Sequence, residues 1–356
     1  MKKIVGILFG GKSTEHEISI ISAKNVYKNI DRSLYNPYLM YIDAVGKWYL
    51  IREEQFQSDK IIPADDQGLS IDMQTNPIGF NIKGGNHSFF PDVIFPVLHG
   101  KNGEDGNMQG FLNILNIPFV GPDMFASAAA MDKEMTKKLL EAVNIKGAKY
   151  FCFRKHEPEK IKYSSILKDL GLPMVIKPSR AGSSVGLSKA TNEKEFLTAV
   201  DLAFRYDTKI IIEEYINGRE IECAVLGNEE PIASVTGEII TEFYDYEAKY
   251  LSAEKAKLQA PANMDKKIEN KIREIAIKAY KAIECEGMSR IDFFLTSDEV
   301  ILNEINTIPG FTDISMYPRL FELSGIPNKE LTSRLLQLAI QRFDNLQKLE
   351  THYIKS

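Results

Sequence analysis

The sequence predicts a mixed α/β and α+β protein with more than one domain, and three observations support this expectation. Short apolar runs alternate with segments of helical spacing as far as about residue 123, which is typical of parallel strands covered by helices. Two apolar strands separated by a short turn follow much later and indicate a β-hairpin. The chain has 356 residues, and at roughly 100–200 residues per domain this length predicts two or three domains.

Composition and charge exclude several classes of protein. The 44 Lys and Arg residues against 49 Asp and Glu give a formal net charge of -5, which argues against nucleic acid or a membrane surface as partner. The three cysteines are widely spaced and favour neither a disulfide framework nor a zinc site. No apolar run approaches the roughly 20 residues that span a bilayer, and the N-terminus does not resemble a secretory leader. We therefore expect a cytoplasmic protein.

The periodicity of the sequence predicts three domains, at residues 1–123, 124–215 and 216–356. Strands are expected at Lys3–Phe9, Asn36–Asp43, Asp92–Leu98, Lys149–Phe153, Met174–Lys177, Lys209–Ile216, Ile221–Leu226, Ile232–Thr236, Met288–Leu295 and Val300–Asn306. Helices are expected from Ser13 or Thr14 onward and over Gly106–Asn116, Asp123–Val143, Glu159–Leu170, Asp265–Ile283, Tyr317–Ser324 and Asn328–Leu349. The first helix is expected to bury Ile18, Ile21, Val26 and Ile30.

The segment Gly6–Ser13 matches the P-loop pattern G-x-x-x-x-G-K-[ST]. Its residues Ile7–Phe9 have the character of the strand itself, so little free loop is left to surround a phosphate. A glycine turn between a strand and a helix is the simpler interpretation, and the amides of such a turn favour an anion.

The loop that follows Lys177 is a better candidate for binding phosphate. An apolar strand ends at Lys177, and the Gly/Ser segment after it offers backbone and hydroxyl donors, including those of Ser183 and Ser184. The alternative is an ordinary surface turn.

The two strands near the C-terminus predict a metal site. Because strand side chains alternate, Arg290 and Asp292 share one face, as do Glu304 and Asn306 on the second strand. A short turn could set Asp292 opposite Glu304, and two opposed carboxylates repel unless a cation lies between them. Oxygen ligands of this kind suit Mg²⁺ held together with phosphates. The alternative is a hairpin with a solvated polar face.

Three weaker signals accompany these motifs. Glu213 and Glu220 could reach a ribose or an amino group, or could simply lie at an exposed strand end. The segment 243–250, rich in tyrosine and charge, could form a lid or a solvated loop. His99, at the end of a strand, could bind a carboxylate or make an ordinary hydrogen bond.

Eight segments in order resemble the D-alanine–D-alanine ligase family of the ATP-grasp superfamily. They are FGGKSTEHEISI, FPVLHGKNGEDGNMQG, SAAAMDK, VIKPSRAGSSVGLSK, EEYINGREIECAVLG, EFYDYEAKY, SRIDFFL and LNEINTIPGFTDISMYP. The resemblance implies a Rossmann-like (pre-ATP-grasp) N-terminal domain followed by a two-part ATP-grasp fold. Such enzymes hold ATP between two α+β domains, so the P-loop interpretation is dropped.

The resemblance also implies roles for individual residues. ATP would be bound by Lys133, Lys177, Ser183, Ser184, Glu213, Glu214, Ile216, Glu220, Phe243, Lys249, Phe294, Leu302, Asn303 and Glu304. Two Mg²⁺ ions, with Mn²⁺ as an alternative, would be bound by Asp292, Glu304 and Asn306. Substrate binding and catalysis would involve Glu15 and His99 at the first D-alanine, Arg290 and Gly310 at the oxyanion, Ser315 and Met316 at the second D-alanine, and Ser183 and Tyr250 in lid closure.

The activity implied by the resemblance is ATP-dependent ligation of two D-alanine molecules through a D-alanyl phosphate, supplying peptidoglycan precursors. Relatives that use D-lactate or D-serine differ near Tyr250 and Ser315, and the residues retained here favour D-alanine. The alternatives are such a related ligase, another ATP-grasp carboxylate–amine ligase, or a binding protein without turnover. The family suggests a homodimer formed mainly through the N-terminal domain.

Overall fold

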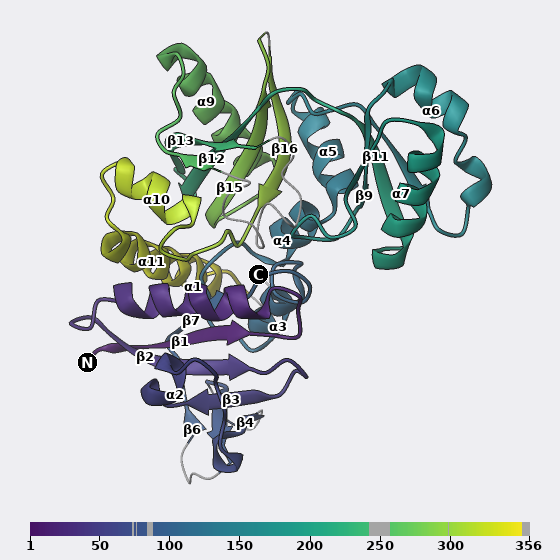
Figure 1. Cartoon of the computed structure of the whole chain (residues 1–356). Helices are drawn as coiled ribbons and strands as arrows, with labels where there is room; N and C mark the ends of the chain where they lie inside the picture. The colour runs from purple at the N-terminus through teal and green to yellow at the C-terminus, as the bar shows by residue number, and fades with distance from the viewer. Residues whose placement is uncertain (73–74, 76, 84–87, 242–256, 298, 351–356) are drawn as a thin grey trace, which may run out of the picture.

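The computed structural model describes residues 1–72, 75, 77–83, 88–241, 257–297 and 299–350. Figure 1 shows a purple N-terminal region below, a small teal region to one side and a green and yellow C-terminal region above. The described residues of these regions form four sheets, accompanied by helices, so the mixed α/β and α+β class predicted from the sequence is confirmed. Within the described ranges, no helix is long and apolar enough to cross a membrane.

The N-terminal sheet has the strand order β3-β2-β1-β7. Its members are β1 (Lys3–Gly10), β2 (Tyr35–Ile42), β3 (Trp48–Ile51) and β7 (Val93–Val97). Strand β1 is parallel to β2 and β7, as the alternating pattern predicts, whereas β3 is antiparallel to β2. The helices of this region are α1 (His16–Asn29), α2 (Glu53–Gln57) and α3 (Asn107–Ile114). A small sheet of β4 (Leu69–Asp72), β5 (Gly79–Ile82) and β6 (Ser88–Phe89) is missing from the sequence-based prediction.

Helix α1 differs from its prediction in two ways. The expected cap at Ser13 or Thr14 is wrong, because the N-cap is Glu15 and the Ser13 hydroxyl accepts the Glu15 N–H at 3.0 Å in the preceding turn. The expected buried position of Ile21 is also wrong, since this side chain is 48% exposed. The residues that α1 buries are Ser19, Ser22, Ala23, Asn25, Val26 and Tyr27. The buried face is therefore partly polar.

The single helix predicted over Asp123–Val143 is divided at Asp132. Helices α4 (Met124–Met131) and α5 (Lys133–Ala142) lie on either side of this residue, which has an extended backbone. The Asp132 carboxylate accepts the N–H of Met135 at 3.3 Å and caps α5. It also pairs with Lys209 at 2.6 Å, which links the start of α5 to the middle sheet.

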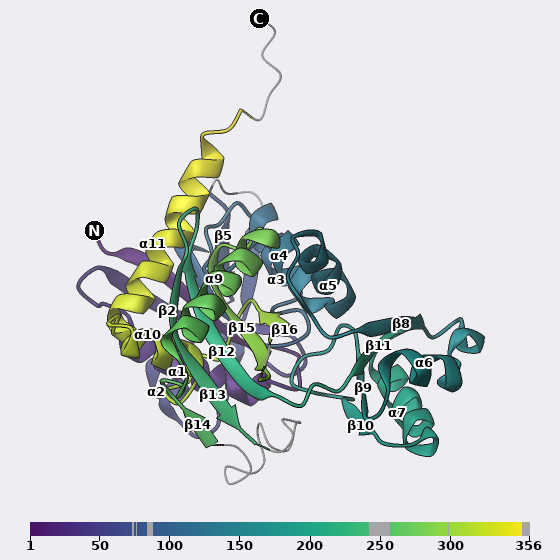
Figure 2. The same cartoon turned by 90° about the horizontal axis from the view of Figure 1, so that it is seen from above.

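The middle sheet is antiparallel, in the order β10-β9-β11-β8. Its strands are β8 (Tyr150–Arg154), β9 (Met174–Pro178), β10 (Ser188–Ala190) and β11 (Lys209–Glu214). Helices α6 (Tyr163–Leu170) and α7 (Glu193–Tyr206) bury Ile166 and Phe196 against this sheet. Figure 2 shows that this region extends away from the rest of the chain.

The C-terminal sheet has the order β14-β13-β12-β15-β16. Its strands are β12 (Arg219–Gly227), β13 (Ile232–Ile240), β14 (Lys257–Gln259), β15 (Gly287–Leu295) and β16 (Val300–Asn306). The accompanying helices are α9 (Lys266–Ala282), α10 (Met316–Leu323) and α11 (Asn328–Gln347). In β15, Ile291, Phe293 and Leu295 are buried while Arg290 and Asp292 are half-buried, which confirms the predicted alternation.

The hydrophobic cores do not follow the order of the chain. Phe95 of β7 packs against Phe311, with ring centroids 5.9 Å apart, in a core that the N-terminal sheet shares with α10 and α11. Similarly, α4 and α5 bury Ala126 and Leu140 in the core of the C-terminal sheet, although the predicted middle domain includes them. The boundaries at residues 123 and 215 stay a prediction.

Candidate active site

A cavity of about 1220 Å³ lies between the middle and C-terminal sheets, and residues from the N-terminal region also line it. Its walls include every predicted site residue of the described part of the chain except Leu302. Phe243, Lys249 and Tyr250 lie outside the described residues. Leu302 is 2% exposed and belongs to the core beneath the sheet, so the expectation that it walls the nucleotide site is corrected.

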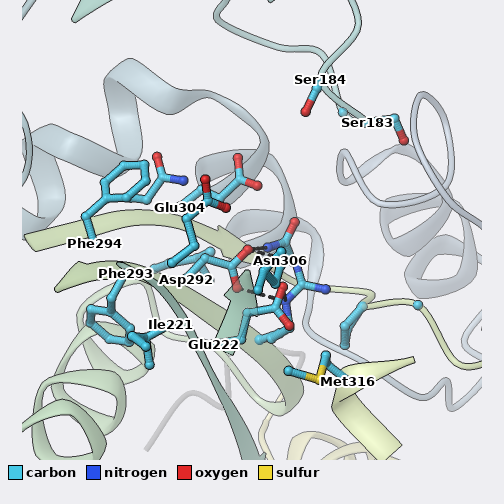
Figure 3. Close-up of a pocket in the computed structure, with 18 of the residues that line it drawn as sticks. Ser183, Ser184, Ile221, Glu222, Asp292, Phe293, Phe294, Glu304, Asn306 and Met316 are labelled. Atoms are coloured by element: carbon cyan, nitrogen blue, oxygen red, sulfur yellow. Dashed lines mark hydrogen bonds and ion pairs between the residues drawn. The ribbon is translucent and has the colours of Figure 1, made fainter. Parts of the chain in front are cut away.

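The paired strands have the expected register. Asp292 lies directly opposite Glu304, and Arg290 lies opposite Asn306. The register shifts after Asp292, so that Leu302 pairs with Phe293 on the buried face. Figure 3 shows the carboxylates of Asp292 and Glu304 near one another on the cavity side.

The Asp292 carboxylate is held by two neighbours. Arg290 donates to it through two nitrogens, at 2.8 and 2.7 Å, and the Asn306 side-chain amide donates at 2.8 Å. Such a bidentate pair fixes both groups in orientation. The guanidinium of Arg290 is therefore held at the cavity wall, where the predicted oxyanion contact requires it.

Glu222 is a residue of this site that the sequence interpretation missed. It lies opposite Asp292 on β12, is 3% exposed, and its carboxylate is 3.1 Å from Arg290 Nε (Figure 3). Arg290 is thus paired with Asp292 on its own strand and with Glu222 on the neighbouring strand β12. The sequence did contain a signal for it. Glu220 and Glu222 are two residues apart on one strand, so their side chains lie on the same face of the sheet.

The predicted magnesium ligands form a donor set that fits the ion. Asp292, Glu304 and Asn306 offer carboxylate and amide oxygens on one face of the sheet, which is the chemistry that Mg²⁺ prefers. The set contains only two acids, and no group of three or more His, Cys, Asp or Glu that could hold a metal occurs among the described residues. Phosphate oxygens and water would have to complete the coordination.

Two buried lysines share the Glu213 carboxylate, and one of them, Lys177, lines the cavity. Lys177 Nζ lies 2.7 Å and Lys137 Nζ 2.9 Å from the two oxygens of Glu213. Burial alone would raise the pKa of Glu213, but the two lysines outweigh it and lower the pKa to about 2. Burial would lower the pKa of Lys177, but Glu213 and Glu304 raise it above its usual value. The cluster therefore carries a net positive charge, which suits a phosphate group.

Lys133 and the Gly/Ser loop are tied together. Lys133 donates from its backbone N–H to the Ser179 carbonyl at 3.0 Å and from Nζ to the Ala181 carbonyl at 2.9 Å. The same Nζ lies 3.9 Å from Glu304. At Ser183 and Ser184 the loop adopts left-handed backbone conformations, with φ of 53° and 54°. The predicted phosphate lysine, the loop and a predicted metal ligand thus come together.

The N-terminal region closes one end of the cavity. The Ser183 hydroxyl donates to the Glu15 carboxylate, which joins the Gly/Ser loop to the start of α1. The carboxyl group of Glu104, a residue that the sequence interpretation missed, also lies at this end of the cavity. Both acids are close to Gly182, because a Cβ atom added to this glycine would lie 3.4 Å from Glu15 Oε2 and 3.3 Å from Glu104 Oε1. Burial and the charge of Glu15 raise the pKa of Glu104 to about 8. This shift favours the neutral carboxylic acid form of Glu104 at neutral pH.

Replacing Glu104 with glutamine tests this state. Because the folded-state pKa lies above the ordinary value of 4.5, the native protein loses stability as pH rises from 4.5 through about 8. The amide of Glu104→Gln stays neutral, so the variant should gain at least about 1 kcal/mol relative to the unmodified chain between pH 5 and 9, given about 1.4 kcal/mol per pKa unit. Urea unfolding at several pH values measures the difference, and a constant difference would contradict the assignment.

The remaining predicted substrate residues already have protein partners. His99 is 5% exposed, with Nδ1 3.2 Å from the Ile308 carbonyl and Nε2 3.2 Å from Ser22 Oγ. The Ser315 hydroxyl accepts the Thr312 N–H at 2.9 Å. Met316 is buried at the start of α10, and Gly310 lies on the cavity wall. Their contacts with substrate stay predictions.

The fold and the cavity together define a class. Two sheets that enclose a cavity, with lysines on one side and paired carboxylates on the other, are the arrangement of the ATP-grasp ligases. The chain belongs to the D-alanine–D-alanine ligase family, because the family descriptions "D-ala D-ala ligase N-terminus" and "D-ala D-ala ligase C-terminus" match residues 4–122 and 139–337.

Individual relatives agree with this membership. The chain is 47% identical to the D-alanine–D-alanine ligase of Oceanobacillus iheyensis, covering 99% of both chains, and 45% identical to D-alanine–D-alanine ligase A of Escherichia coli, covering 96% of this chain and 97% of that one. Among solved structures, the D-alanine–D-alanine ligase of Coxiella burnetii has a TM-score of 0.86 at 38% identity, covering 98% of this chain and 96% of that one. The VanG D-Ala:D-Ser ligase of Enterococcus faecalis has a TM-score of 0.86 at 36% identity, covering 95% and 100%.

Proposed function

We propose that this protein joins two D-alanine molecules to D-alanyl-D-alanine, converting ATP to ADP and phosphate, for peptidoglycan synthesis. The observation that carries the proposal is that residues from distant family segments line one cavity. Glu15, Lys177, Asp292 and Gly310 come from different parts of the chain and share this space. The chemistry of ligation requires such a gathering of cationic, acidic and amide groups.

The first step is phosphoryl transfer to the first D-alanine. Its carboxylate oxygen attacks the γ-phosphorus, the bond to the bridging oxygen breaks, and ADP and D-alanyl phosphate result. Lys133 and Lys177 lie where they can neutralise the phosphates, and Glu15 can bind the substrate ammonium. Catalysis of this kind consists of positioning and charge stabilisation.

Asp292, Glu304 and Asn306 are the residues that would hold Mg²⁺. The bound ion supplies positive charge to the phosphate oxygens as the transfer proceeds. We extend the proposal to two such ions, with Mn²⁺ as a substitute. The hydrogen bonds from Asn306 and Arg290 to the Asp292 carboxylate support this assignment, because they fix its orientation.

The second step forms the peptide bond. The second D-alanine loses its ammonium proton, its amine attacks the acyl carbon, and a tetrahedral intermediate expels phosphate. Arg290 and the Gly310 N–H can donate to the developing oxyanion. Because an acyl phosphate reacts with water, the contact between Ser183 and Glu15 helps to exclude solvent from the cavity.

The identity of the second substrate distinguishes the proposed D-alanine–D-alanine ligase from a related ligase that uses another acceptor. The VanG neighbour is a D-Ala:D-Ser ligase, so D-serine is the competing second substrate. Phosphate release from Mg-ATP should require D-alanine and be at least about 10-fold slower when D-serine or D-lactate must be the acceptor, equivalent to about 1.4 kcal/mol. L-alanine should give no turnover. Absence of D-alanine-dependent phosphate release would refute the proposal, and preference for D-serine would establish the alternative.

We also propose that the protein works in the cytoplasm as a homodimer formed through its N-terminal region. Its substrates are small molecules, and its mild acidity gives no reason to invoke nucleic acid or a membrane. Light scattering during size-exclusion chromatography measures the mass directly. A mass near 40.2 kDa, that of one chain, would contradict the dimer.

A further inference from the structure

The segment that carries Gly310 is held from the N-terminal region by buried side chains. Asn25 Nδ2 donates to the Phe311 carbonyl at 2.9 Å, and the Phe311 N–H donates to Ser22 Oγ at 3.3 Å. His99 Nδ1 contacts the Ile308 carbonyl at 3.2 Å, so both sides of Gly310 are fixed. Ser22, Asn25 and His99 are 0%, 8% and 5% exposed.

The hydrogen bonds among these groups have a single consistent direction. The Ile308 carbonyl can only accept, so His99 carries its proton on Nδ1. Nε2 of the neutral ring then accepts from the Ser22 hydroxyl, whose oxygen in turn accepts the Phe311 N–H. Burial lowers the pKa of His99, in agreement with a neutral ring. The Ile308 carbonyl, the His99 ring, the Ser22 hydroxyl and the Phe311 N–H are therefore joined in one series of hydrogen bonds, which makes this arrangement stiff.

Helix α1 connects this arrangement to the first substrate. Glu15 is the N-cap of α1, and Ser22 and Asn25 lie on the buried face of the same helix. A helix rises 1.5 Å per residue and behaves as a rigid element. One element thus sets the position of the proposed ammonium ligand and of the loop with the proposed oxyanion donor.

We propose that Ser22 and Asn25 are positioning residues for the second step of ligation, holding the Gly310 amide at the place where the oxyanion forms. The inference rests on the proposed function. Neither side chain is assigned a contact with substrate. Asn25 acts through the backbone of Phe311, whereas Ser22 acts through the same backbone and through His99. Misplacement of a reacting group by about 1 Å can reduce a rate about 100-fold. Loss of either hydrogen bond should therefore slow peptide-bond formation more than phosphoryl transfer.

The variants Asn25→Ala and Ser22→Ala test this, with Lys24→Ala as the matched control. Lys24 precedes Asn25 on α1, and its ammonium group donates to the Ser58 carbonyl at 3.3 Å. The first step is followed by positional isotope exchange in ATP labelled with ¹⁸O at the β,γ-bridge, in the presence of D-alanine. The complete reaction is followed by dipeptide formation, and melting temperatures report on folding.

Asn25→Ala should lower kcat for dipeptide synthesis about 10- to 100-fold, while D-alanine-dependent exchange stays within about twofold and the KM for ATP is unchanged. Ser22→Ala should lower synthesis over the same range, and any additional loss of exchange in this variant reports on His99, whose Nε2 it leaves without the Ser22 hydroxyl. Lys24→Ala should retain both activities. A parallel loss of exchange and synthesis in Asn25→Ala, or no loss of synthesis in either variant, would overturn the positioning role. Absence of D-alanine-dependent exchange in the unmodified protein would instead refute the proposed function.

Discussion

Glu304→Gln is expected to lower kcat for dipeptide synthesis by about 10²- to 10³-fold, the range observed when one charge-stabilising group is removed from an active site. Glu304 lies opposite Asp292 and 3.9 Å from Lys133 Nζ, so it links the proposed metal site to the phosphate lysine. Glutamine has the same shape but no charge. Glu304 is a cleaner target than Asp292, whose replacement would also leave Arg290 without its bidentate partner.

Glu299→Gln is the matched control for this substitution. Glu299 belongs to the turn just before β16, and its pair with Lys146 is exposed on both sides, at 47% and 55%. An exposed pair of this kind contributes at most about 1 kcal/mol, so activity and melting temperature should be close to those of the unmodified chain. Titration with Mg²⁺ should show an increased requirement in Glu304→Gln only. Full activity of Glu304→Gln at the same Mg²⁺ concentration would eliminate Glu304 as a ligand.

The face of the β15–β16 hairpin was predictable because its determinants are local. Alternation placed Asp292 and Arg290 together, and the short turn limited the register that could set Asp292 opposite Glu304. The place of Leu302, which the resemblance assigned to the nucleotide site, did not follow from this reasoning. The register shift after Asp292 turns Leu302 toward the core, and no local pattern marks such an irregularity.

The two acids that sequence reasoning missed depend on contacts between distant segments. Glu104 lies in a loop without periodicity, and its importance arises from the approach of Glu15 and Gly182. Glu222 lies within a mostly apolar strand whose sequence is typical of a buried core strand. Its place in the site follows from its pairing with Arg290 on the neighbouring strand.

The buried face of α1 shows the limit of hydrophobic periodicity. The apolar pattern favoured Ile21, whereas the helix buries Ser22 and Asn25. A buried polar group is tolerated where it is hydrogen-bonded, and the partner here is the backbone of Phe311, 286 residues from Asn25 along the chain. Single-sequence patterns carry no information about such a partner.

Glu213→Gln is expected to lower the free energy of unfolding by about 3–5 kcal/mol, the usual effect of removing one partner from a buried ion pair. Lys137 and Lys177 are 5% and 6% exposed, and the substitution would leave both without their shared counter-ion. Urea unfolding at pH 7 measures the loss. Glu214→Gln is the control, because Glu214 is half-buried and accepts a single backbone N–H at 2.8 Å; it should cost at most about 1 kcal/mol.

The pH dependence of the same variant separates the charge of Glu213 from its shape. The folded-state pKa of about 2 lies below the ordinary 4.5, so the carboxylate stabilises the native state above pH 4.5 and this contribution is lost as pH falls toward 2. The difference between the unmodified chain and Glu213→Gln should therefore shrink over that interval, whereas a packing defect would keep it constant. ATP should raise the melting temperature of the variant more than that of the unmodified chain, because its phosphates can replace the missing negative charge beside Lys177. Equal stabilisation by ATP would mean that Lys177 does not contact the phosphates of the nucleotide.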